Sequence, residues 1–112
     1  MAGFGGMMQG SVPIFDGKVF DDWRIKMQAI FNFQDVAEVV TEGVAELSLK
    51  ATKEEKKNHK AQLKLDSKAR YLIYQCVTPK IFNKISKAAI AKEAWEILVK
   101  TYGEGDKNKK VR

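Results

Sequence analysis

The chain has 112 residues, 45% of them hydrophobic and 30% charged, and a formal net charge of +6. This length fits one domain, the composition is that of a soluble globular protein, and no apolar run reaches the ~20 residues that a membrane span needs. One cysteine and one histidine exclude an intramolecular disulfide and a four-ligand zinc site within the chain, and a lone cysteine suits a reducing, cytoplasmic setting.

The two ends differ in composition from the rest of the chain. Residues 1–12 carry four glycines and few anchoring side chains, which predicts a disordered arm. They also lack the cationic start and long apolar stretch of a secretory signal. Residues 104–112 are polar, and four of the last six are basic. We expect this tail to be the start of a truncated helix and the domain itself to span 13–103.

An apolar stripe centred on Trp23 predicts the first helix. Asp21 or Asp22 supplies the acceptor and the negative charge that favour a helix N-terminus. Before it, Pro13 and Gly17 punctuate an extended lead-in, which could fold back onto the helix through its own apolar residues. At 100° per residue the large apolar side chains share one broad face: Phe20, Trp23, Met27, Ile30 and Phe31. We interpret Trp23 as a packing anchor rather than a ligand-binding residue.

A second, short helix is predicted between Asp35 and Gly43. Asp35 and Glu38 have the spacing of a capping box, and Gly43 is suited to end a helix. Val36, Val39 and Val40 form the apolar side of this element. Valines weaken an isolated helix, so this one must be held in place by packing.

The longest predicted helix begins at a second capping box, formed by Thr52 and Glu55, and runs without Gly or Pro to Val77. Its second half places apolar residues on one stripe: Leu65, Ala69, Leu72, Ile73 and Cys76. The stretch 69–77 alone would also fit a strand, but the upstream cap and the Thr-Pro stop that follows favour one long helix. Tyr71 and Tyr74 fall off the stripe. Either this helix is central in a bundle, or it offers a second face to another subunit.

Two further helices are predicted after Val77. Thr78 as N-cap and Pro79 in the first turn begin a short helix through Ile81, Phe82 and Ile85. Residues 86–90 are either a turn or a frayed continuation of this helix. The last helix runs from Ala91 to Tyr102 and ends at Gly103. It places Trp95, Leu98, Val99 and Tyr102 on one side, with Glu96 and Lys100 as an i, i+4 ion pair on the other.

These elements predict an all-α fold, a small orthogonal bundle of about five helices. The residues expected to anchor its core are Phe15, Phe20, Trp23, Met27, Leu72, Ile73, Cys76, Trp95, Leu98 and Tyr102. We find no P-loop, dinucleotide fingerprint, nucleophile elbow or His-rich metal pattern. We therefore expect no enzyme, no cofactor, no metal and no small-molecule substrate.

Positive charge is concentrated between Lys50 and Arg70, a stretch that contains eight basic residues and only three acidic ones. Such a helix could attract nucleic-acid phosphates through Lys53, Lys56, Lys57, Lys60 and Lys64. The alternative is a solvated helix that uses lysine for solubility and helix propensity. No aromatic residue lies among these lysines to stack bases, and no Gly-rich turn cradles phosphate. This favours the solvated helix and argues against recognition of specific bases.

Several short motifs resemble, in order and spacing, the Gag polyprotein of plant copia-type LTR retrotransposons. They are Phe15-Asp16-Gly17, Phe20-Asp21-Asp22-Trp23 with Met27, Ala91-Lys92-Glu93-Ala94-Trp95-Glu96-Ile97-Leu98, and Tyr102-Gly103. The long middle helix also closes on a similar Val-Thr-Pro turn, so the resemblance covers about residues 12–112. Ile90 departs from the small hydroxyl residue expected as N-cap before Ala91, so the last helix should begin less sharply.

The resemblance implies a capsid-type, amino-terminal domain, a helical bundle that self-associates with other Gag subunits into particles around genomic RNA. The zinc knuckle with which such proteins grip RNA is absent from this sequence. RNA would therefore bind mainly through a missing downstream region, with at most weak direct contact here. The chain also ends where relatives continue into further helices, which implies either an amino-terminal fragment or a shortened, host-retained copy.

Two hypotheses follow. The first is a structural assembly module whose contact residues lie off the core stripes: Ile25, Tyr71 and Tyr74. Ile25 points about 160° away from Trp23, where a monomer would carry a polar residue. The second is a basic helical module that binds RNA or DNA non-specifically through 53–64.

Overall fold

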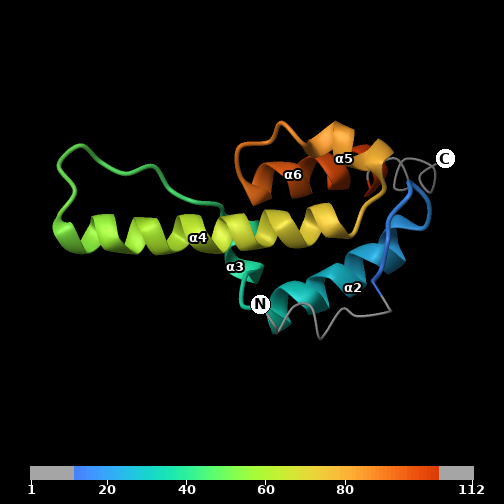
Figure 1. The fold of residues 1–112 in the computed structure, drawn as a ribbon, viewed down its shortest axis with the longest axis horizontal. Helices are drawn as coiled ribbons and strands as arrows, with labels where there is room; N and C mark the ends of the chain where they lie inside the picture. Colours follow the sequence, from blue (N-terminus) through green and yellow to red (C-terminus); the bar gives the residue numbers. More distant parts are fainter. Residues whose placement is uncertain (1–11, 104–112) are drawn as a thin grey trace.

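The computed structural model describes residues 12–103, which form a helical bundle (Figure 1). In chain order the elements are α2 (Phe20–Phe33), α3 (Ala37–Glu42), α4 (Lys53–Gln75), α5 (Pro79–Ile85), α6 (Ala91–Leu98) and a π-helical turn, η1 (Val99–Gly103). The predicted small all-α bundle of about five helices is confirmed. The predicted tail at 104–112, and the predicted arm at 1–12 except for its last residue, lie outside the described residues.

The core lies where the second half of α4 meets α2, α3, α5 and α6. Eight of the ten expected anchors are buried: Phe15, Phe20, Trp23, Met27, Leu72, Ile73, Cys76 and Leu98. Trp95 and Tyr102 are partly buried and pack against this cluster. Phe31, Val36, Val39, Ile81 and Ile85 complete much of the remaining core.

Trp23 joins three distant segments of the chain. Its indole N–H donates to the carbonyl oxygens of Pro13 at 3.1 Å and of Cys76 at 3.0 Å. The ring of Phe15 stacks on the indole with centroids 4.9 Å apart. The backbone of Phe15 bonds the α4–α5 turn in both directions, through the Cys76 carbonyl at 2.9 Å and the Thr78 N–H at 3.0 Å. The extended lead-in is therefore fixed between α2 and the end of α4.

The predicted capping box at Asp35 is wrong. Asp35 has a left-handed backbone with φ 61°, and α3 begins at Ala37 without a side-chain cap. The Val36 N–H bonds the Phe31 carbonyl at 2.9 Å and the Asp35 N–H bonds the Asn32 carbonyl at 3.2 Å. These two bonds form a Schellman motif, in which a residue with positive φ closes the preceding helix. Asp35 therefore ends α2 instead of starting α3.

The other predicted helix boundaries match the structure closely. α2 starts at Phe20, so Asp21 and Asp22 place negative charge in its first turn as predicted. The prediction that one of them supplies the capping acceptor is wrong, because the N-cap is Val19 and no side chain caps this helix. Both bonds of the Thr52–Glu55 capping box are present, at 2.9 and 3.0 Å. α3 ends before Gly43, whose φ is +78° and where an added Cβ would lie 3.0 Å from Cδ of Lys92. Glycine is favoured at this point because L side chains rarely adopt this positive φ.

The last helix has the predicted extent but changes form at Val99, where η1 begins. A π turn alters the angular spacing of side chains. Glu96 pairs with Lys92 at 3.4 Å, so the predicted Glu96–Lys100 pair is wrong.

The start of α6 receives its cap from another helix. Ile90 supplies no side-chain cap, as its apolar side chain requires. The carboxylate of Asp66, on α4, accepts the Ala91 N–H at 2.7 Å and the Nε–H of Arg70 at 2.8 Å. Asp66 is only 1% exposed. A buried carboxylate is thus held by one cation and one helix N-terminus, both of which favour negative charge.

The first half of α4 extends beyond the other helices, accompanied by the connection from α3 (Figure 1). We call residues 44–64 the projection and the rest of the described chain the body. No residue of the projection is buried. Among the described residues, no helix is long and apolar enough to cross a bilayer.

Candidate interfaces for self-association and nucleic acid

The outer face of α2 carries an exposed apolar stripe. Ile25 is 61% exposed and Phe33 is 66% exposed. Ala29, which is also exposed, lies between them at one-turn intervals. We call these three residues the α2 stripe. The opposite side of the same helix is buried, so α2 is apolar on two faces and only one of them is covered within the chain.

A groove of about 260 Å³ runs between α2, α3 and α6. Gln28, Phe31 and Asn32 line it from α2, and Trp95 contributes from α6. At 100° per residue Gln28 and Asn32 directly flank the α2 stripe. The apolar stripe therefore has a recess along one edge, which is a feature that a protruding side chain of a partner can fill.

The three predicted self-association residues come from two different helices. Ile25 lies on α2, whereas Tyr71 and Tyr74 lie on α4. Tyr74 packs edge-on against Phe82, with ring centroids 5.0 Å apart, and belongs to the margin of the core. Tyr71 is 52% exposed. Sequence reasoning missed Ala29 and Phe33, although their i+4 and i+8 spacing from Ile25 was a usable signal.

The lysines of the projection share one face of α4. At 100° per residue Lys53, Lys56, Lys57, Lys60 and Lys64 occupy about 100° of the circumference and span about 17 Å of the axis. All five are exposed. We call them the lysine face. Across residues 12–103, none of them takes part in an ion pair. Tyr71 continues the line of Lys53 and Lys64 two turns further on.

The other basic side chains of α4 bind the body. Lys68 donates to the Gln34 carbonyl at 3.0 Å, at the end of α2. Arg70 pairs with buried Asp66 at 2.8 Å. The cluster of positive charge read from the sequence therefore divides in two, since its last members stabilise the fold and its first members face solvent.

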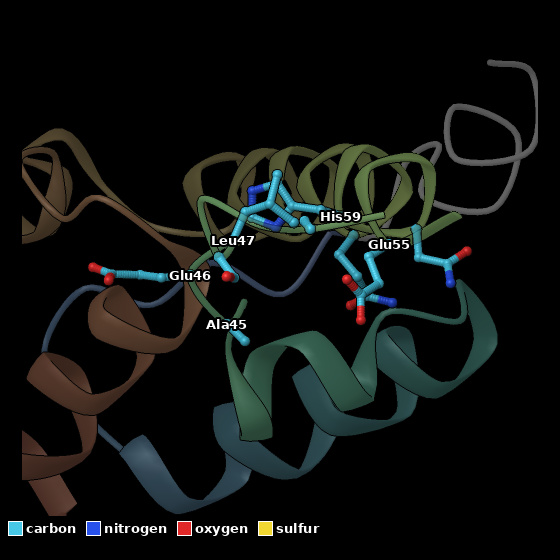
Figure 2. Close-up of a pocket in the computed structure, with 9 residues that line it drawn as sticks. Ala45, Glu46, Leu47, Glu55 and His59 are labelled. Atoms are coloured by element: carbon cyan, nitrogen blue, oxygen red, sulfur yellow. The ribbon is translucent and has the colours of Figure 1, made fainter. Parts of the chain in front are cut away.

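A cleft of about 340 Å³ opens between α4 and the connection that precedes it (Figure 2). Its lining includes Leu47 from the connection and Glu55 and His59 from α4. The Glu55 carboxylate is committed to the helix cap. No group of three metal-ligating side chains occurs in the part of the chain that the structure describes. The cleft thus contains the imidazole of His59 but no arrangement of side chains that would bind a metal ion.

Cys76 lies at the opposite end of α4 from His59 and is fully buried. Burial raises the pKa of its thiol to about 11, because an apolar environment disfavours the thiolate. The thiol is therefore protonated at neutral pH and is a poor nucleophile. Its role in the structure is that of a small apolar side chain.

A family model described as gag-polypeptide of LTR copia-type matches residues 27–112. The chain belongs to this family. The copia-type Gag resemblance predicted from the motifs is thereby confirmed. The match contains the whole lysine face and, of the α2 stripe, Ala29 and Phe33. No match to this Gag chain was found among curated proteins or among solved structures.

Proposed function

We propose that this Gag chain is a capsid-type structural module that self-associates into particles through the α2 stripe and has no catalytic role. The observation that carries the proposal is the exposure of Ile25 and Phe33 on a helix whose other side is already buried. The motifs and the lone cysteine further indicate a plant element and a cytoplasmic site of assembly.

The α2 stripe has the composition of a helix–helix contact. A small residue at its centre, Ala29, allows two helices to approach closely, while Ile25 and Phe33 supply the apolar area. Covering each large side chain contributes about 1 kcal/mol or more. In a two-fold arrangement centred on Ala29, Ile25 of one copy faces Phe33 of the other, so the surface is complementary to itself.

The groove beside the stripe supports the same proposal. Its volume of about 260 Å³ is sufficient to receive an aromatic ring at the edge of such a contact. Membership of a Gag family, whose members serve as structural polypeptides, is consistent with a module that acts by assembling.

Sedimentation velocity tests the proposal on three variants and the wild type over a wide concentration range. We expect the wild-type sedimentation coefficient to rise with concentration. Ile25→Asp and Phe33→Asp should each weaken association roughly 100-fold, because a carboxylate would be buried without a partner. Leu49→Asp is the matched control, since Leu49 is fully exposed on the projection and lies outside the stripe.

Thermal unfolding of each variant verifies that the body is intact. A wild-type chain that stays monomeric at every concentration would contradict the proposal. So would a Leu49→Asp variant that loses association as strongly as Ile25→Asp, because general surface charge would then explain the result.

A further inference from the structure

We infer that the lysine face binds the phosphate backbone of a nucleic acid without reading its bases. This inference is independent of self-association through the α2 stripe, because it rests on a different helix and a different kind of contact. It assigns a ligand to the projection, none of whose residues is buried in the core of the body.

The geometry of the lysine face suits a linear polyanion. Lys53, Lys57, Lys60 and Lys64 follow one another at intervals of three or four residues, which is about 4.5 to 6 Å of helix axis, and Lys56 lies at one edge of the same face. No acidic residue of α4 falls within the same 100° sector. Each ammonium group is therefore exposed and available to replace a condensed counterion on a phosphate.

The shape of the projection leaves room for a long ligand. The first half of α4 extends from the body, as Figure 1 shows. The connection from α3 borders the cleft on the side of Glu55, Asn58 and Gln62. At 100° per residue these residues lie opposite the lysine face. A strand of nucleic acid can thus follow all five lysines without meeting another element of the described chain.

The chemistry of the projection argues against two other partners. A helix that binds a membrane surface needs an apolar face opposite its basic face, and here that face carries Glu55, Asn58 and Gln62. Protein interfaces are depleted in lysine and enriched in aromatic and arginine anchors, and the lysine face contains lysine alone. Point charges without planar hydrogen-bonding groups attract phosphate but do not discriminate bases.

One protein partner does have matching charge. Residues 27–49 contain four acidic residues and no basic ones: Asp35, Glu38, Glu42 and Glu46. All four are exposed. A second copy could place this acidic segment on the lysine face. Five exposed lysines along one face of α4 favour the phosphate backbone, and the experiment below separates the two partners.

Fluorescence anisotropy with a labelled single-stranded RNA, and with DNA of the same sequence, tests the inference on the full chain. The variant is Lys57→Gln/Lys60→Gln/Lys64→Gln, which keeps helix propensity while removing three charges. The control is Lys80→Gln/Lys84→Gln/Lys87→Gln, which removes three exposed lysines around α5. Circular dichroism establishes that both variants remain helical.

We expect wild-type affinity to fall as salt rises, with RNA and DNA bound within a few-fold of each other. In the lysine-face variant the slope of log affinity against log salt should be about 2 units shallower, because three contacts each contribute about 0.7 on a single strand. Its affinity at low salt should fall at least about tenfold. The α5 control should keep the wild-type slope.

Four results would overturn the inference. They are an absence of binding, binding that does not depend on salt, an equal loss in both triple variants, and a lysine-face variant that loses self-association in sedimentation velocity while it keeps RNA affinity. The last result would assign the lysine face to the acidic segment of a second copy. The two proposals fail in different measurements. Failure of the α2 stripe would appear in sedimentation velocity of Ile25→Asp, and failure of the lysine face would appear in RNA affinity and its salt dependence.

Discussion

The two halves of α4 form one continuous helix but are held in place by different forces. In the second half Ala69, Leu72 and Ile73 are buried, and Asp66 connects α4 to the start of α6. In the first half no residue is buried, and the helix begins at the Thr52–Glu55 capping box. One half is therefore stabilised by the core, and the other by local interactions and helix propensity.

The difference follows from a change of residue type along one helix face. The face that buries Ala69 and Ile73 continues toward the N-terminus as Gln62, Asn58 and Glu55. These polar side chains provide little hydrophobic driving force to pack the connection against the helix, so the projection has an open cleft where the body has a core. A helix segment free of packing can carry a row of charges at little cost, which is the condition that a phosphate-binding face requires.

The comparison is tested most strongly by the same substitution in each half. Leu72 is 1% exposed and Leu63 is 44% exposed. Leu72→Ala should lower the free energy of unfolding by about 3 kcal/mol, because it removes buried area and leaves a cavity. Leu63→Ala should lower it by less than about 1 kcal/mol. Urea denaturation followed by circular dichroism measures both, and equal losses would show that the projection is packed.

Removal of the Asp66 carboxylate is expected to have the next largest effect. Asp66→Ala leaves the Ala91 N–H and the Arg70 guanidinium without their buried acceptor, at a cost of about 2 kcal/mol. Asp66→Asn keeps an oxygen for Ala91 and should recover about half of the loss. Urea midpoints compare the two variants. A wild-type midpoint for Asp66→Ala would mean that the cap between helices contributes nothing.

Trp23 offers a test of how the lead-in is attached to the end of α4. Trp23→Phe keeps an aromatic ring but removes the N–H that bonds the Pro13 and Cys76 carbonyls, and it should lower stability by about 1.5 kcal/mol. Trp95→Phe is the control, because that indole is only partly buried, and about half the loss is expected. Thermal unfolding monitors both variants. A larger loss for Trp95→Phe would reverse the roles assigned to the two rings.

The smallest effect is expected at the capping box. Thr52→Ala should cost about 1 kcal/mol locally, since it releases the Glu55 N–H. Hydrogen exchange should quicken in the first turns of α4 while the amides near Leu72 remain protected. Thr78→Ala is a matched control, because Thr78 is an N-cap whose hydroxyl makes no cap bond. Faster exchange along the whole of α4 would mean that both halves open together.

Several features could be read from the sequence because they depend on neighbours along the chain. The capping box at Thr52, the Thr-Pro start of α5 and the apolar period from Ala69 to Cys76 are each set by residues within one or two turns. The outer position of Ile25 follows from the same periodicity. These local signals determined an all-α bundle, most helix boundaries and most of the core.

Other features arise only where separate segments meet. Asp35 is a residue type that often serves as an N-cap, but here it closes α2. Its backbone adopts the left-handed conformation, with positive φ, where the chain leaves α2 and turns toward α3. The cap of α6 comes from Asp66, 25 residues away. The division of the basic cluster into lysines that bind the body and lysines that face solvent has the same origin. Helix period is a local property of the sequence, whereas burial, long-range hydrogen bonds and exposed surfaces exist only after distant segments pack together.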